Sequence, residues 1–407
     1  MNKLLAEGKA HHLDHDHSSR TIDPPSVLVE LLKHAGIRFD GPNPWDIQVR
    51  DGEIYQRILT RGSLGFGEAY MDGLWDCPRL DELFDRLLSA DTDLRVQQLN
   101  RWRLISSILR HKLINLQSPK RAFQVGERHY DIGNDIFEAM LDETMSYSCG
   151  YWEDAENLNQ AQQHKLQLIC EKLQLEPGER LLDIGCGWGG LAHYAATNYD
   201  VEVLGITVSA EQQQLARQRC AGLPVRIELT DYRDLRGKYD KVVSVGMFEH
   251  VGLKNYATFF NTVQNLMSRD GLFLLHTIGN YRKTPHTDPW IEKYIFPNGK
   301  LPAARQLSAA LERSFLIEDW HNFGQDYDRT LMAWWENFER AWPSLRSRYD
   351  ERFWRMWRYY LLSCAGYFRS RQGQLWQLVL TGRRRRRTYR SIRIGRRGLM
   401  AAARDLH

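Results

Sequence analysis

The run Leu181–Gly190 (LLDIGCGWGG) constrains the fold more than any other part of the chain. Its apolar start predicts a buried strand, and residues 191–198 after it predict a helix. Between the two, Gly185, Gly187 and Gly189 let the backbone turn sharply and approach a ligand closely. A strand that passes through a glycine turn into a helix is typical of an open α/β sheet that binds a ligand at the turn.

Strands and helices continue to alternate after this turn. The pattern predicts strands at 180–184, 201–206, 225–229, 241–245 and 271–278, with helices at 210–220 and 256–267 between them. A further strand pair is expected near 316–321, and the chain after Asp328 is helical and rich in aromatic residues. Alternation of this kind predicts an α/β fold with a mostly parallel, doubly wound, Rossmann-like sheet.

Composition narrows the class of protein. No apolar run among the 407 residues approaches the roughly 20 that a membrane-spanning helix needs. The first 17 residues are too polar for a secretory signal, and the six cysteines show no paired spacing. We therefore expect a protein of the reducing cytoplasm with free thiols and no metal site.

Five segments are expected along the chain. They are a flexible N-terminus (1–22), a smaller accessory, lipid-binding domain (23–100), a basic amphipathic helix (101–123), a catalytic domain (124–380) and an Arg-rich tail (381–407). The helix at 101–116 is expected either to lie on an anionic membrane or to pack between domains.

Basic residues are concentrated near the C-terminus. Residues 383–397 hold nine arginines and no acid, whereas the formal net charge of the whole chain is only +4. A solvated terminus, an anionic lipid surface and nucleic acid are all compatible with such a run, and the chemistry developed below favours lipid over nucleic acid.

The glycine turn also predicts the kind of ligand. Its spacing is G-x-G-x-G rather than the G-x-G-x-x-G of dinucleotide enzymes, and Asp183 before it would repel a pyrophosphate. An acid at this position suits the amino-acid end of S-adenosylmethionine. The residues expected around this cofactor are Tyr147, Ser148, Asp183, Gly185, Cys186, Gly187, Trp188 and Gly189.

Two later strand ends complete the expected cofactor site. Thr207, Ser209 and Gln212 follow the second strand, where a ribose would be held by hydrogen bonds. Asp231 and Tyr232 follow the third strand and are placed to meet an adenine. The Glu249-His250 pair ends the fourth strand, at the edge where open α/β sheets bind ligands.

Several motifs together resemble the cyclopropane-fatty-acyl-phospholipid synthase family, a mycolic acid cyclopropane synthase-like group of S-adenosylmethionine-dependent methyltransferases. The stretches that carry the resemblance are HYDIGND (129–135), YSCGYW (147–152), LDIGCGWGG (182–190), MFEHVG (247–252), LHTIG (275–279), YIFPNG (294–299) and DYD (326–328). The resemblance covers residues 25–379.

The resemblance implies a reaction on unsaturated acyl chains of membrane phospholipids. The methyl group of S-adenosylmethionine would add to a cis double bond, and a proton would then leave to a bound bicarbonate as a cyclopropane ring closes. The catalytic residues it implies are Cys149, Glu249, His276, Ile278 (through its backbone), Tyr327 and, less directly, Cys364. It also implies a homodimer that works at the inner face of the cell membrane.

The residue types suit that chemistry. Methyl transfer to an alkene creates a carbocation, which aromatic rings such as those of Tyr147, Trp188 and Tyr327 attract by roughly 0.5–2 kcal/mol each. A thiolate would itself attack the cofactor, so we expect a neutral thiol at Cys149. Alternatives are a methyltransferase that closes no ring, acting on acyl chains or RNA, and an inactive lipid-binding protein.

Overall fold

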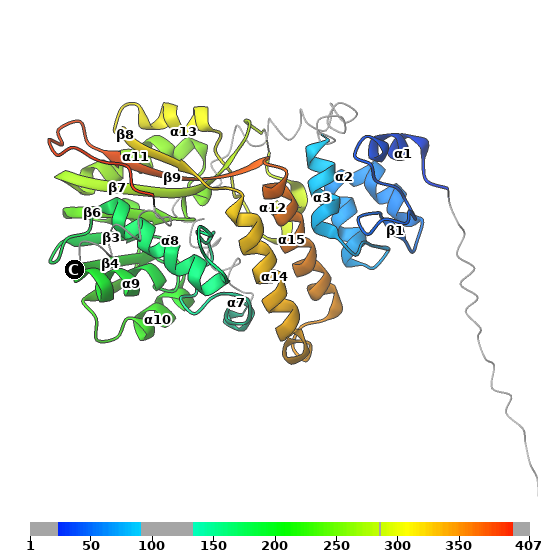
Figure 1. The fold of residues 1–407 in the computed structure, drawn as a ribbon, viewed down its shortest axis with the longest axis horizontal. Coiled ribbons are helices and arrows are strands. Elements are labelled where there is room, and N and C mark those ends of the chain that lie inside the picture. Colours follow the sequence, from blue (N-terminus) through cyan, green and yellow to red (C-terminus); the bar gives the residue numbers. More distant parts are fainter. Residues whose placement is uncertain (1–22, 91–132, 285, 394–407) are drawn as a thin grey trace, which may run out of the picture.

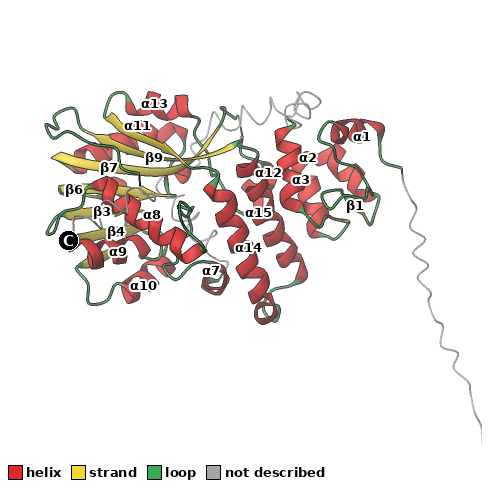
Figure 2. Ribbon diagram, in the orientation of Figure 1, coloured by secondary structure: helices red, strands yellow, loops and turns green. Residues whose placement is uncertain are grey.

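A seven-stranded sheet forms the centre of the computed structural model, which describes residues 23–90, 133–284 and 286–393. The strands are β3 (Arg180–Ile184), β4 (Glu202–Thr207), β5 (Val225–Leu229), β6 (Tyr239–Val245), β7 (Met267–Asn280), β8 (Leu316–Asn322) and β9 (Gly373–Thr381). Their order is β5-β4-β3-β6-β7-β9-β8, of which Figure 2 labels β4, β3, β6, β7 and β9. Strands β3 to β7 pair in parallel, and β9 is antiparallel to both β7 and β8. The predicted, mostly parallel sheet is confirmed.

Helices cover both faces of this sheet (Figure 1). One face carries α8 (Leu158–Leu173), α9 (Gly190–Tyr199) and α10 (Ala210–Arg219), and the other carries α11 (Tyr256–Leu266) and α13 (Ala304–Leu311). Two separate apolar clusters result, one with Ile169 and Ala195 against the sheet and one with Phe259 and Leu307. The doubly wound architecture is therefore confirmed.

A third layer of helices lies beyond the carboxyl ends of the parallel strands. Its long members are α14 (Asp326–Leu345) and α15 (Glu351–Arg369), which stand between the sheet and the N-terminal helices (Figure 1). The N-terminal part contains α1 (Ser26–Lys33), α2 (Glu53–Met71), α3 (Leu80–Ser89) and the small sheet of β1 (Gln48–Val49) and β2 (Trp75–Asp76). Short helices α7 (Asn134–Met140) and α12 (Pro289–Tyr294) fill the junction.

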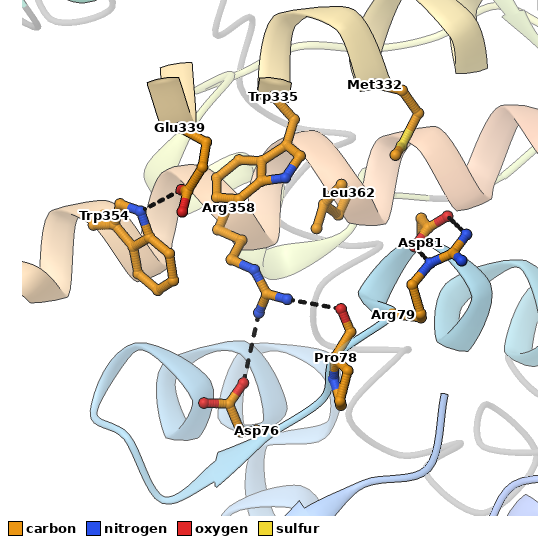
Figure 3. Close-up of a pocket in the computed structure, with 10 residues that line it drawn as sticks. All are labelled: Asp76, Pro78, Arg79, Asp81, Met332, Trp335, Glu339, Trp354, Arg358 and Leu362. Carbon is orange, nitrogen blue, oxygen red and sulfur yellow. Dashed lines mark hydrogen bonds and ion pairs between the residues drawn. The ribbon is translucent and has the colours of Figure 1, made fainter. Parts of the chain in front are cut away.

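The described N-terminal residues share their core with α14 and α15. Trp75 is buried in the same apolar cluster as Trp290 and Trp357. The buried Arg355 of α15 donates to the Trp75 carbonyl at 2.8 Å and to Asp76 at 3.2 Å. Arg358 reaches the Pro78 carbonyl in the same way (Figure 3). Residues 23–90 thus pack as a layer of the whole molecule, and the predicted domain boundary at 100 lies outside the described residues.

The strand pair expected near 316–321 is wrong, and the described part of the Arg-rich segment is packed on the sheet. Residues 316–322 form one strand, β8, whose partner is β9; β9 follows helices α14 and α15 in the sequence and inserts between β7 and β8. Residues 382–393 do not form a free tail: Tyr389 is buried, Arg385 donates to the Asp270 carbonyl at 2.9 Å and Arg393 binds Asp319. The predicted helix at 101–123 and residues 394–407 lie outside the described residues.

The direction of β9 determines where the Arg-rich segment lies relative to the glycine turn. Strand β9 runs antiparallel, so Gly373 pairs with Asn280 and Thr381 pairs with Leu272 at the start of β7. The segment that follows Thr381 therefore leaves the sheet at the edge opposite the glycine turn. Among the described residues no helix is long and apolar enough to cross a membrane.

Candidate active site

The glycine turn stands at the carboxyl end of β3, and its three glycines all have left-handed backbones, with φ of 84° at Gly185, 55° at Gly187 and 82° at Gly189. A Cβ on Gly185 would approach the Met247 Cβ to 2.7 Å. A Cβ on Gly187 would meet nothing within 4 Å. Gly185 is thus needed for packing inside the protein, whereas Gly187 leaves open space beside the turn.

That open space belongs to a cavity of about 1690 Å³. Eleven of the thirteen predicted cofactor residues line it: Tyr147, Ser148, Asp183, Gly185, Cys186, Gly187, Trp188, Thr207, Gln212, Asp231 and Tyr232. Gly189 and Ser209 are not among the lining residues. They stand at the N-caps of α9 and α10, where the Ser209 Oγ accepts from the Gln212 N–H at 3.3 Å, so they shape the turns.

The polar groups beyond β4 and β5 are already held by one another. The Thr207 hydroxyl donates to the Gln212 Oε1 at 2.8 Å, which leaves the amide NH₂ of Gln212 as the available donor. Both carboxylate oxygens of Asp231 accept from the Arg233 guanidinium, at 2.7 and 2.6 Å. Asp231 therefore lines the cavity as an oriented carboxylate.

A buried lysine beside the turn was missed by the sequence analysis. Lys165 of α8 lines the cavity and donates to the Ser148 Oγ at 3.0 Å. Burial lowers its pKa to about 8, and burial raises the pKa of Asp183 to about 7 although Lys165 opposes that shift. The signal in the sequence was a lysine on the apolar face of a helix that also buries Gln162 and Ile169.

Two further buried polar residues lie near the carboxyl end of β6: Glu249 follows this strand, and His276 of β7 pairs with its last residue, Val245. The Glu249 Oε1 accepts from the Ile278 N–H at 2.7 Å. Its Oε2 and the Nε2 of His276 have no hydrogen-bond partner among the described residues. Burial raises the pKa of Glu249 to about 7 and holds the pKa of His276 well below its usual value. Two unsatisfied buried atoms of this kind fit a small ion that both donates and accepts hydrogen bonds.

Only some of the predicted catalytic residues line the cavity. Tyr327, Ile278 and Cys364 line the cavity together with Glu249, whereas His276 and Cys149 are not among the lining residues. The backbone N–H of Ile278 is used by Glu249, so its role in the structure is to orient that carboxyl group.

The thiols and the phenol are all neutral. Burial raises the pKa of Cys149 and of Tyr327 well above their usual values and raises that of Cys364 to about 12. The Cys149 Sγ lies 3.2 Å from the Gly150 carbonyl and 3.8 Å from the Thr330 hydroxyl. This agrees with the neutral thiol expected at Cys149, which cannot compete for a methyl group.

Aromatic side chains form the far wall of the cavity. The hydroxyls of Tyr147 and Tyr360 lie 2.7 Å apart, and the ring of Tyr327 stacks on Phe368 with 4.5 Å between centroids. Sequence analysis did not single out Tyr360. The cavity then continues between apolar side chains of the N-terminal helices: Leu28, Leu31, Leu32, Ile58, Phe66 and Phe84. A space with one polar end and one long apolar end suits a chain-like apolar molecule.

Comparison with known proteins gives consistent matches. A family model described as mycolic acid cyclopropane synthetase matches residues 117–378. The chain is 56% identical over 355 residues to the cyclopropane-fatty-acyl-phospholipid synthase of Escherichia coli K12, which covers 87% of this chain and 92% of that protein. It is 35% identical to the tuberculostearic acid methyltransferase UfaA1 of Mycobacterium tuberculosis, over 81% of this chain and 82% of the relative.

Solved structures give the same result as the sequence comparisons. The cyclopropane synthase MmaA2 of Mycobacterium tuberculosis superimposes with a TM-score of 0.60 at 30% identity, covering 63% of this chain and 97% of that one. The mycolic acid cyclopropane synthase CmaA1, solved with SAH and CTAB, gives a TM-score of 0.59 at 31% identity with the same coverage.

A single added methyl group tests the cofactor turn. We expect Gly187→Ala to weaken S-adenosylmethionine binding about tenfold or more, because its Cβ would enter the open space beside the turn. Gly178→Ala is the matched control: Gly178 also has a left-handed φ, of 78°, and no neighbour within 4 Å, but it does not line the cavity. Both variants carry about 1–2 kcal/mol of backbone strain. Calorimetry on the two folded proteins measures the affinity, and equal losses would contradict the assignment.

Proposed function

The chain belongs to the mycolic acid cyclopropane synthetase family of S-adenosylmethionine-dependent methyltransferases, and we propose that it forms cyclopropane rings on unsaturated acyl chains of membrane phospholipids. The family resemblance predicted from the motifs is confirmed. The observation that supports the substrate is the cavity that joins the glycine turn to the apolar faces of α1–α3.

The reaction joins one carbon to an alkene. One alkene carbon bonds to the methyl carbon of S-adenosylmethionine as the carbon–sulfur bond breaks, and the other alkene carbon becomes positive. Loss of a proton from the new methyl group then supplies the electron pair that closes the ring. The rings of Tyr147, Tyr327 and Tyr360 stabilise the positive carbon, and the dry apolar wall excludes water that would trap it.

Bicarbonate is the base that we propose for the last step. It supplies a proton acceptor that does not itself become methylated. Glu249, His276 and Tyr327 would hold it, because they contribute an unsatisfied carboxyl oxygen, an unsatisfied ring nitrogen and a phenol that stays protonated. Ile278 fixes the Glu249 carboxyl group through its backbone N–H, and Cys149 packs behind the site without charge.

A second candidate is acyl-chain methylation without ring closure. It is favoured by the match to UfaA1, whose name describes a methyltransferase. The two reactions share every step up to the carbocation, so the positions of Glu249 and His276 alone do not separate them.

Product analysis tests the proposed function. We expect phospholipid vesicles with monounsaturated chains, incubated with the protein and S-adenosylmethionine, to gain one CH₂ per modified chain and to lose their alkene reactivity. Mass spectrometry before and after ozonolysis measures both changes. A gain of mass with the alkene retained would establish the second candidate, and no gain at all would contradict both.

The Glu249→Gln variant tests the proposed base. Gln keeps the oxygen that accepts from Ile278 but replaces the unsatisfied Oε2 by an NH₂ group, so the ion would meet a donor where it met an acceptor. We expect ring formation to fall about 100-fold or more while calorimetric affinity for S-adenosylmethionine stays unchanged. In degassed buffer, added bicarbonate or borate should raise the wild-type rate and leave the variant nearly unaffected. Identical bicarbonate dependence in both proteins would remove Glu249 from this role.

We propose that an anionic membrane binds the surface at the open end of the cavity. We call this surface the mouth, and its residues are Tyr281, Arg282 and the exposed valines of helix α1. Tyr281 lines the cavity and is 65% exposed, and Arg282 stacks over its ring. Helix α1 lines the cavity with leucines and exposes Val27 and Val29. The Arg-rich segment, which the sequence favoured for this role, is at the opposite edge of the sheet in its described part. Peripheral attachment to the cytoplasmic side of the membrane stays a prediction. The homodimer also stays a prediction, which sedimentation velocity can test.

Exposed apolar residues allow a matched test of the mouth. We expect Val27→Ser with Tyr281→Ser to weaken cosedimentation with anionic phospholipid vesicles several-fold, because these side chains would enter the interface. Leu316→Ser with Ile317→Ser is the control, since these residues are 49% and 42% exposed at the start of β8, near the edge remote from the turn. Equal effects of the two pairs would contradict docking at the mouth.

A further inference from the structure

His276 has one partnered and one unpartnered ring nitrogen. Its Nδ1 lies 3.2 Å from the Nε2 of Gln377, and its own Nε2 has no partner among the described residues. The ring is buried and neutral, so one nitrogen carries a proton and the other a lone pair. Which nitrogen carries the proton decides whether the free nitrogen donates or accepts a hydrogen bond.

Gln377 is held in one orientation from its other side. It lies on β9 directly opposite His276 on β7, and its Oε1 is 2.9 Å from the Nζ of Lys172. An ammonium group only donates, so the oxygen of the amide must face Lys172 and the NH₂ must face His276. An NH₂ group only donates as well, which makes the Nδ1 of His276 an acceptor.

Lys172 is itself surrounded by acceptors. Its side chain is fully buried, with the His321 Nδ1 at 3.1 Å and the Asp319 Oδ2 at 3.4 Å. Asp319 also accepts from both terminal nitrogens of Arg393, at 2.7 and 2.8 Å, and Arg393 holds the pKa of its carboxyl group low. Burial lowers the pKa of Lys172 to about 7, and the ionised carboxylate of Asp319 opposes that shift. The orientation of Gln377 is therefore that of the ammonium form of Lys172, which Asp319 stabilises.

We propose that Gln377, oriented by Lys172, is a positioning residue that fixes the proton of His276 on Nε2. The free nitrogen is then a hydrogen-bond donor, which is the group that an anion beside Glu249 requires. The tautomer follows from the hydrogen bonds of Gln377 when Lys172 is an ammonium group, whereas its use toward bicarbonate rests on the proposed function.

Nitrogen-15 NMR of histidine-labelled protein tests the tautomer without cofactor or lipid. The His276 signals are assigned by their loss in His276→Gln, and we expect a pyrrole-type Nε2 and a pyridine-type Nδ1. Gln377→Glu replaces the NH₂ by a carboxylate oxygen, so the proton should move to Nδ1 and the two signal types should exchange. Gln374→Glu is the control: it makes the same change three residues earlier on β9, where the side chain contacts Asn322 and the Arg371 carbonyl.

Two further measurements separate a positioning role from a structural one. Gln377→Glu should retain its affinity for S-adenosylmethionine while bicarbonate-stimulated turnover falls about tenfold or more. Lys172→Met should leave the amide free to rotate and populate both tautomers. The proposal is overturned if wild-type protein carries the proton on Nδ1, or if folded Gln377→Glu and Lys172→Met both keep the wild-type pattern. A product without a ring would overturn the proposed function and leave the tautomer assignment standing.

Discussion

Desolvation of polar groups at the carboxyl edge of the sheet is the constraint on which the rest of the site depends. Burial raises the pKa of Asp183 and Glu249 to about 7 and moves the pKa of Cys149, Tyr327 and His276 toward their neutral forms. Burial in a medium of low dielectric constant therefore disfavours the charged forms of these groups. The carbocation of the proposed reaction would meet the aromatic rings of Tyr147, Tyr327 and Tyr360 there, and its neighbouring thiols at Cys149 and Cys364 have raised pKa values.

These polar groups are buried because the third layer of helices packs over the carboxyl ends of the parallel strands. In other α/β sheets this end is usually open to solvent. Tyr327 and Trp334 come from α14, and Tyr360 comes from α15. Arg369 binds Asp328 at 2.9 Å and Asp81 at 2.7 Å, which joins α14, α15 and α3 through one guanidinium. The N-terminal residues are thus part of the wall of the cavity and form its apolar end.

The sequence predicted what local patterns determine. Strand β3 has the predicted bounds, and the acid and glycines of 183–189 stand where a strand–turn–helix must place them. It could not predict contacts made between distant segments: Lys165 and Gln377 look like ordinary polar residues until α8 and β9 bring them beside Ser148 and His276. The strand pair expected near 316–321 was wrong for the same reason, because the partner of β8 is β9, which begins only at Gly373.

Arg393 shows why a run of like residues has no single role. It lies beyond residue 378, where the family match ends, in a run of arginines that are mostly exposed, and its own side chain is 41% exposed. Its position is set instead by Asp319, whose side chain is only 4% exposed and stands between Lys172 and Arg393. A buried carboxylate without a cation is strongly unfavourable, and two cations without the carboxylate would repel each other. Ser391 and Arg393 therefore pack against β8, where both bond the buried Asp319. From Asp319 the contacts continue through Lys172 and Gln377 to the ring of His276.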